Sequence, residues 1–253
     1  MRLKFTLAYD GAHFRGWQSQ PGGGSVQDVL QEALTRIGGG RKISLHGSGR
    51  TDAGVHALGQ VAHADVPDGR SAAQFWLPAL NAVLPAQVRV LSCVRTADDF
   101  HARFSAAGKV YEYLLWVAPV LPPHWAGRCW HVKPPPDPAL LRLAARLFTG
   151  KHDFRGFSAN RGTPVADALR TIRRASVRCE GPMIRLRFEG EGFLYKMVRM
   201  LVAAMVRVAQ DRSSVDDLRA RLAGQESALR REVAPPDGLY LTAVRYPLRP
   251  QSG

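Results

Sequence analysis

The spacing of short segments in which apolar and polar residues alternate constrains the fold of this chain most strongly. Such alternation is typical of half-buried strands, and it predicts strands at residues 3–9, 58–66, 88–94, 109–116, 170–179, 183–189 and 238–246. Apolar residues at helical spacing predict helices at residues 26–37, 71–77, 140–148, 193–210 and 214–224. The chain has more predicted strands than a fold made only of parallel strand–helix–strand units would have. We therefore expect an α+β fold with a mainly antiparallel sheet.

Local signals place the boundaries of several of these elements. Ser25 with Asp28 three residues later forms a weak capping box, and the glycines at 38–40 end the first helix. Asp137 followed by Pro138 favours another helix start. We expect the second helix to end at Pro78, residues 119–138 to form an irregular crossover, and residues 151–158 to form a polar loop.

One carboxylate lies in a glycine-rich segment that can form a tight turn. Asp52 lies between Arg50 and an Ala53-Gly54 turn, just before the strand at 58–66. Glycine there permits sharp turns or close approach of a ligand, and the fork of Arg50 suits a phosphate or a carboxylate. We expect Asp52 on a loop at the mouth of a sheet, where functional side chains collect. An alternative is a turn residue that binds its own backbone.

The charge balance favours a polyanionic partner. Thirty-five lysines and arginines against 21 acids give a net charge of +14 among 253 residues, and nucleic acid is the main candidate. Three widely spaced cysteines favour a reducing compartment. The N-terminus lacks a signal-peptide core and no apolar segment is long enough to span a membrane, so we expect a cytoplasmic protein. The histidine and cysteine groups lack zinc spacing, so we expect no metal.

Two further features leave alternatives open. Phe14 and Trp17 lie in a loop, where they could stack on bases or cover the core. Arg173, Arg185 and Arg187 would line the predicted hairpin at 170–189 with positive charge. That charge could follow an RNA backbone or belong to a solvated strand face.

Four separated motifs resemble TruA-type tRNA pseudouridine synthases. They are Gly-Arg-Thr-Asp-Ala-Gly-Val-His at 49–56 followed by Gln60-Val61, Phe-His-Ala-Arg-Phe-Ser at 100–105, the segment around Met-Val-Arg at 197–199, and Gly-Leu-Tyr-Leu at 238–241. The resemblance covers almost the whole chain. Several positions depart from the residues common in this family, and they concern substrate binding and helix packing. They are Met200, Ala203-Ala204, Tyr195-Lys196 and Val110.

The resemblance implies a fold and a reaction. Members of this family have two similar α/β halves with mainly antiparallel sheets, fused across a central basic RNA-binding cleft. They convert uridine to pseudouridine at tRNA positions 38, 39 and 40 in the anticodon stem-loop, use no metal or organic cofactor, and form homodimers. We expect an N-terminal half at 1–105, a C-terminal half at 106–247 and a tail at 248–253.

The resemblance also assigns roles to five residues. Asp52 matches the catalytic carboxylate, Arg199 the arginine that pairs with it, and Tyr111 the aromatic that stacks on the target base. Arg50 matches the residue that prises the base from the stem, and Leu241 would wall the pocket. A non-catalytic RNA-binding protein and a uridine-modifying enzyme with other targets are the two alternatives.

Overall fold

The computed structural model describes residues 1–67, 73–159, 162 and 166–247. It divides into two units, one of residues 1–107 with 240–253 and the other of residues 108–239. The first unit runs to residue 107, two residues beyond the predicted end of the N-terminal half at residue 105. The segment from Tyr240, predicted in the C-terminal half, groups with the first unit because its strand pairs there. The predicted tail at 248–253 and the predicted helix start at 71–72 lie outside the described residues.

The first unit is built on a mostly antiparallel sheet. Its strands are β1 (Arg2–Tyr9), β2 (Leu45–Gly47), β3 (His56–Asp65), β4 (Val88–Arg95) and β10 (Leu239–Arg245). The order is β4-β1-β3-β10, with β2 also on β3. β1 runs antiparallel to β3 and β4, while β10 runs parallel to β3. In β1, burial alternates as the sequence predicted, with Leu3, Phe5 and Leu7 buried between half-buried neighbours.

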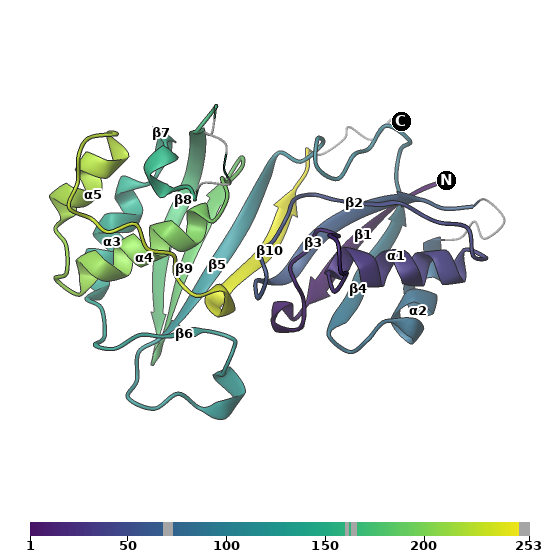
Figure 1. Cartoon of the computed structure of the whole chain (residues 1–253), viewed down its shortest axis with the longest axis horizontal. Coiled ribbons are helices and arrows are strands. Elements are labelled where there is room, and N and C mark those ends of the chain that lie inside the picture. The colour runs from purple at the N-terminus through teal and green to yellow at the C-terminus, as the bar shows by residue number, and fades with distance from the viewer. Residues whose placement is uncertain (68–72, 160–161, 163–165, 248–253) are drawn as a thin grey trace. The chain divides into compact units, whose positions relative to one another are not determined.

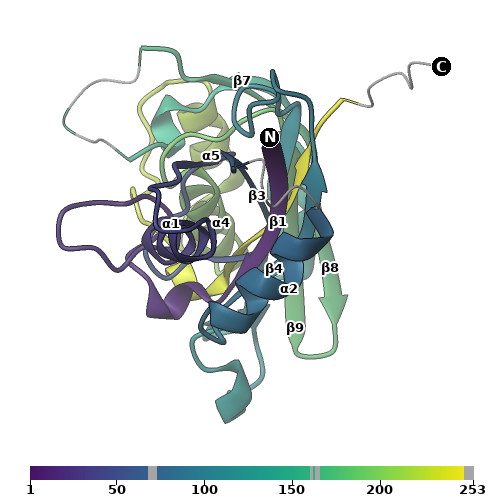
Figure 2. The same cartoon turned by 90° about the vertical axis from the view of Figure 1, so that its right-hand side faces the viewer.

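Two helices pack in the first unit. The capping box of Ser25 and Asp28 opens α1 (Val26–Ile37), and the helix ends at Gly38, as predicted. Its buried stripe consists of Val26, Leu30, Ala33, Leu34 and Ile37. α2 (Ala73–Val83) packs against α1 and β4, and Figure 2 shows it beside β4.

The prediction that α2 ends at Pro78 was wrong. Pro78 lies inside the helix, which continues to Val83. Proline removes one backbone donor but does not forbid helix when tertiary contacts hold the next turn. Asn81 supplies such a contact, since its side-chain amide donates to Val90 O at 2.8 Å and accepts from Val90 N at 2.9 Å.

The second unit has its own antiparallel strands. They are β5 (Gly108–Trp116), β6 (Trp130–His131), β7 (Gly150–Asp153), β8 (Leu169–Glu180) and β9 (Met183–Gly190), ordered β5-β9-β8-β7 with β6 parallel to β5. The predicted hairpin is confirmed, because β8 and β9 pair from Ile172–Gly190 to Glu180–Met183 around Gly181-Pro182. The prediction of a loop at 151–158 was wrong in part: β7 pairs with β8 there, and a short 3-10 helix η4 (Arg155–Phe157) follows.

Helices α3 (Pro138–Leu147), α4 (Met197–Ala209) and α5 (Val215–Leu222) gather beside β8 and β9 (Figure 1). α4 begins four residues later than predicted, after Lys196 in a left-handed conformation with φ 57°. It is also buried on nearly every side, because α3 and α5 both pack against it. α4 is therefore more buried than a helix with a single apolar face would be.

Short 3-10 segments complete the connections. They are η1 (Gly11–His13), η3 (Pro123–Trp125) and η5 (Pro236–Gly238). Among the described residues, no helix is both long and apolar enough to cross a membrane.

The arginines of the hairpin are largely paired with acids. Arg185 and Arg187 contact the two carboxylate oxygens of Glu112 at 2.9 and 2.8 Å, and Arg173 contacts Glu191 at 3.1 Å. Glu180 and Glu189 add further pairs. This compensation favours the solvated-face interpretation over a continuous cationic track.

Candidate functional site

The turn that carries Asp52 connects β2 to β3 in the first unit. The N–H of Val55 donates to Asp52 O at 3.1 Å, which closes the turn. Gly54 has φ 79°, a conformation that glycine adopts without steric cost. Asp52 is half-buried between buried Thr51 and exposed Ala53. The prediction that Asp52 stands on a loop leading into a strand is confirmed.

Thr51 ties this turn to β1. Its hydroxyl lies 2.8 Å from the hydroxyl of buried Tyr9, and its carbonyl accepts from Trp17 N at 3.1 Å. Burial raises the pKa of Tyr9 to about 12, so the phenol is neutral at ordinary pH. Gly16 is required beside this turn, because a Cβ there would lie 2.7 Å from Thr51 O.

Trp17 belongs to the core. Its side chain is 2% exposed, and a Cβ on Gly47 would lie 2.4 Å from the indole. The core-cover alternative for Trp17 is therefore confirmed, while Phe14 is half-buried.

A buried glutamine braces the other side of the turn. Gln60 accepts from the Ser48 hydroxyl at 2.7 Å and donates to Gly49 O at 3.0 Å. Both contacts lie a few residues before Asp52. Since a buried amide left without partners is costly, these bonds fix the path of residues 48–49. No role was predicted for Gln60, although a polar residue at an apolar strand position is the signal that could have revealed it.

Arg50 projects from the same loop. It is exposed, and its Nε donates to Gln18 Oε1 at 3.3 Å. Gln18 in turn donates to Gln27 Oε1 at 2.8 Å, so the contact leads back to α1. The guanidinium stands at the surface, where its planar fork suits a phosphate.

Leu241 lies on β10, whose parallel pairing brings it opposite Ala57. It is 1% exposed. Its neighbour Tyr240 stacks on His56, with ring centroids 4.6 Å apart and planes 16° apart. Segments nearly 200 residues apart in sequence thus meet beside the Asp52 turn.

Tyr111 lies on β5 in the second unit and is largely buried. Phe193 meets its ring edge-on, with centroids 5.1 Å apart at 82°. Edge-to-face pairs restrain both rings. Phe193 precedes α4, and its position in the third motif was the only sequence signal that pointed to it.

Arg199 lies on α4 of the second unit. Its Nε donates to Ala234 O at 2.7 Å, while Ala234 N donates to Arg199 O at 3.2 Å. The adjacent Pro235 O accepts from the Tyr113 hydroxyl at 2.7 Å. Burial raises the pKa of Tyr113, so this hydroxyl stays a donor. The backbone at 234–235 therefore sets the orientation of the Arg199 side chain.

The five predicted site residues thus fall into two groups. Asp52, Arg50 and Leu241 belong to the first unit, and Tyr111 and Arg199 belong to the second. In the part of the chain that the structure describes, no three His, Cys, Asp or Glu side chains form a group suited to a metal ion.

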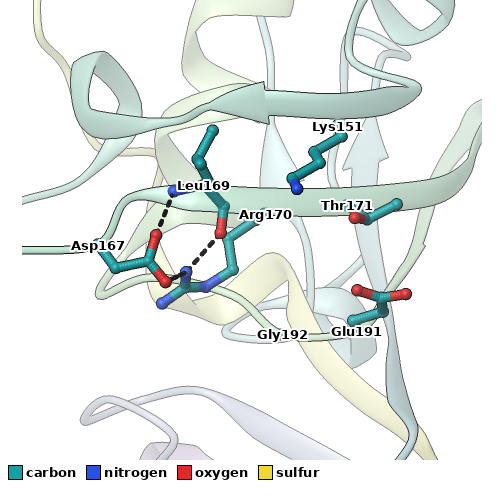
Figure 3. A pocket seen from close by; sticks show the side chains of 7 residues that line it. All are labelled: Lys151, Asp167, Leu169, Arg170, Thr171, Glu191 and Gly192. Carbon is teal, nitrogen blue, oxygen red and sulfur yellow. Dashed lines mark hydrogen bonds and ion pairs between the residues drawn. The ribbon is translucent and has the colours of Figure 1, made fainter.

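A depression of about 530 Å³ in the second unit contains none of these five residues (Figure 3). Its two cations and two acids offset one another, and the Arg170 guanidinium lies 3.5 Å from Asp167. The lining residues are Lys151, Asp167, Leu169, Arg170, Thr171, Glu191 and Gly192. This mixed charge offers no focused anion site.

Comparison with known proteins gives one consistent family. The family model described as tRNA pseudouridine synthase matches residues 6–105 and 144–247. A tRNA pseudouridine synthase A of Akkermansia muciniphila is 45% identical, over 97% of this chain and 95% of the relative. Proteins of the same name from Geobacillus kaustophilus and Streptococcus gordonii are 44% and 38% identical, each over 97% of this chain and over 94% and 98% of the relative.

A solved structure titled as a Cbf5-Nop10-Gar1 complex is a much weaker match. The similarity covers 95% of this chain and 49% of that chain, at 13% identity and a TM-score of 0.42. A similarity this low has no bearing on fold or function.

Proposed function

Because this chain belongs to the tRNA pseudouridine synthase family, we propose that it isomerises uridine to pseudouridine at positions 38, 39 and 40 of the tRNA anticodon stem-loop. The observation that carries the proposal is the extent of the family match. The two matched segments contain Asp52 and Arg50 in the first, and Arg199 and Leu241 in the second. Tyr111 lies between them, within the 97% of the chain that aligns with the relatives.

The reaction exchanges one bond to the ribose for another. The N1–C1′ glycosidic bond breaks, the freed base turns, and C5 forms a new bond to C1′. The proton on C5 leaves, and N1 gains a proton. Atoms and electrons balance within the nucleotide, so no redox step or energy source is required. The protein must supply a carboxylate and hold the detached base in place.

Asp52 is the proposed carboxylate. It acts either as a nucleophile or as a base that removes a proton. The turn supports this role because Tyr9, Thr51 and Gln60 fix its backbone before any substrate arrives. Such preorganisation avoids the cost of ordering the group during the reaction.

Arg199 is the proposed partner that keeps Asp52 ionised. A nearby cation favours the charged form of a carboxylate in a desolvated site. The bond from Nε to Ala234 O supports this role, since it restrains the guanidinium of a long side chain.

The remaining proposed contacts handle the target nucleotide. Tyr111 stacks on the base, Arg50 holds a phosphate while the base leaves the stem, and Leu241 forms a wall of the pocket. Chemistry on a paired base requires flipping, and stacking on an aromatic is worth about 1–3 kcal/mol per base.

We extend the proposal to the arrangement of the protein. Two α/β halves enclose a basic RNA-binding cleft, two copies form a homodimer, and the enzyme acts in the cytoplasm without a metal or organic cofactor. The net charge of +14 supports a cleft for a polyanion.

The test uses purified protein and unmodified tRNA, with pseudouridine mapped at single-nucleotide resolution. We expect product at 38, 39 and 40. Asp52→Ala should lower the rate by at least about 100-fold, the scale of a lost catalytic acid or base, and should keep tRNA affinity. Asp216→Ala, which removes an exposed carboxylate on α5, is the matched control and should retain full activity.

Two results would overturn the proposal. Product confined to other uridines would replace the assigned target, and full activity of Asp52→Ala would remove the assigned carboxylate. Mapping pseudouridine in tRNA from cells that lack the gene gives the same distinction in vivo.

A further inference from the structure

An exposed aromatic ring stands at the tip of the turn formed by residues 101–105. Phe104 is 77% exposed, the largest exposed fraction among the large hydrophobic side chains of the described residues. The turn belongs to the first unit and lies within the second motif of the sequence. Neither the Asp52 turn nor the proposed reaction uses it.

The turn is held by its own hydrogen bonds. Ser105 N donates to His101 O at 2.9 Å, and His101 N donates to Ser105 Oγ at 3.0 Å. Nδ1 of His101 accepts from Arg103 N at 3.1 Å and from Phe104 N at 3.3 Å. Because a ring nitrogen that accepts cannot carry a proton, these bonds require neutral His101. Phe104 is therefore presented on a fixed backbone.

Contacts below the turn anchor it to the sheet. Ala102 N donates to Nδ1 of buried His63 at 3.1 Å, and Ala102 O accepts from the Tyr246 hydroxyl at 2.7 Å. Phe100 and Ala102 are buried against Val61. The exposed ring thus rests on a rigid base, so a ligand would not have to order it.

Aromatic and cationic groups surround Phe104. The His101 ring lies 4.3 Å away between centroids, tilted by 33°, and His46 continues the row at 5.7 Å from His101. The guanidinium carbon of Arg103 lies 5.6 Å from the Phe104 centroid. Among the described residues, no carboxylate is within ion-pair distance of Arg103.

We propose that Phe104, His101 and Arg103 form a stacking platform for an unpaired base of RNA, with Arg103 binding the adjoining phosphate. An aromatic face combined with a cation is the chemistry by which proteins hold single-stranded nucleotides. The proposal rests on the proposed function in one respect, that the RNA is the tRNA substrate.

The surroundings favour one nucleotide over a protein partner. Acidic residues are depleted at protein interfaces, whereas exposed Asp98 and Asp99 lie a few residues before Phe104 in the sequence. Arg103 is the cation that lies against the Phe104 ring, so the platform suits a single base with its phosphate.

Three substitutions at one position separate stacking from simple apolar contact. Phe104→Ala should weaken tRNA binding by about 5-fold or more, which corresponds to the lower limit for one stacked base. Phe104→Leu keeps an apolar side chain and should lose as much, while Phe104→Tyr keeps the ring and should stay within about 2-fold. Leu91→Ala, which shortens a 53% exposed side chain on β4, is the matched control and should bind normally.

Arg103→Ala tests the phosphate contact. It should reduce the slope of log affinity against log salt by about one. Binding and pseudouridine formation are measured on the same samples, with sedimentation velocity to give the oligomeric state.

Wild-type affinity of Phe104→Leu or Phe104→Ala would overturn the platform. So would a Phe104→Ala protein that changes oligomeric state and binds tRNA normally, since the ring would then contact a second copy. If wild-type protein binds tRNA yet forms no pseudouridine, the proposed function fails while the platform is still judged from binding. If Asp52→Ala alone abolishes product and Phe104→Ala binds normally, only the platform fails.

Discussion

The hydroxyl groups of Tyr9 and Thr51 lie 2.8 Å apart, so the last residue of β1 holds the residue immediately before Asp52. Forty-two positions separate the two residues in sequence. The contact links the core of the first unit directly to the proposed catalytic turn. Its loss should therefore change the stability of the protein, which can be measured without RNA.

Tyr9→Phe removes this bond without changing the volume of the ring. We expect the free energy of unfolding to fall by about 0.5–1.5 kcal/mol, the net value of one hydrogen bond, and kcat to fall because the turn is less restrained. Urea denaturation and single-turnover kinetics measure both. Tyr246→Phe removes the comparable bond to Ala102 O, far from Asp52 in the sequence, and should lower stability without lowering kcat at saturating tRNA. Equal kcat for the two variants would contradict the link to Asp52.

Gly11→Ala should disturb the same turn from a different side. A Cβ at residue 11 would lie 2.1 Å from Val55 O, so the backbone must move. We expect a loss of about 1–3 kcal/mol in stability, the range for forced overpacking, together with loss of activity. Gly192→Ala is the control, because its nearest neighbours lie at 3.8 Å. A Gly11→Ala protein as stable as Gly192→Ala would show that the contact is not rigid.

Stability should decrease in mild acid because of His63. Burial, with smaller electrostatic contributions from His101, His46 and Arg2, lowers the pKa of His63 to about 4 from 6.5. The unfolded chain takes up this proton near pH 6.5 and the folded protein near pH 4. The contribution is complete above pH 6.5 and is lost as pH falls toward 4.

Thermal unfolding between pH 4 and 8 measures that loss. His63→Gln keeps an acceptor for Ala102 N without the titration, so its stability should depend less on pH in this window. An unchanged pH dependence would assign the effect to other groups.

Arg187→Ala tests whether the β8–β9 hairpin binds along the RNA backbone. Glu112 already pairs with this arginine at 2.8 Å, so we expect tRNA affinity to stay within about 2-fold and the salt slope to be unchanged. A loss of about one unit of slope, like that expected for Arg103→Ala, would restore the RNA-tracking interpretation.

Arg199→Lys tests the proposed ion pair with Asp52. Lysine has no Nε–H to donate to Ala234 O and no planar fork, so it cannot reproduce the restraint seen for arginine. We expect kcat to fall by about 10-fold or more, which corresponds to a loss of about 1.4 kcal/mol in transition-state stabilisation, with KM for tRNA close to wild type. Equal losses in kcat and affinity would indicate a general binding role.

Local sequence signals were sufficient for elements that local chemistry determines. The capping box at Ser25 and the β8–β9 hairpin both occur as the sequence predicts. The position of Asp52 on a tight turn also followed from neighbouring glycines.

Tertiary contacts determined the features that sequence could not supply. The continuation of α2 through Pro78 depends on Asn81 binding a strand that comes later in the chain. The burial of α4 depends on two other helices, and the neutral state of His63 depends on a loop 39 residues away. The roles assigned to Asp52, Arg199 and Tyr111 came from the resemblance to a family and stay predictions until variants are measured.

Because β10 pairs with β3, the first unit cannot complete its sheet until the second unit has been translated. Domains generally form as the chain emerges, with the N-terminal one first. Here residues 108–239 are continuous, whereas the other unit needs residues 240–245 to complete its sheet. Residues 1–107 must therefore wait for residues 240–245 to be translated, and the Asp52 turn acquires its β10 neighbours only after the whole of the second unit has been made.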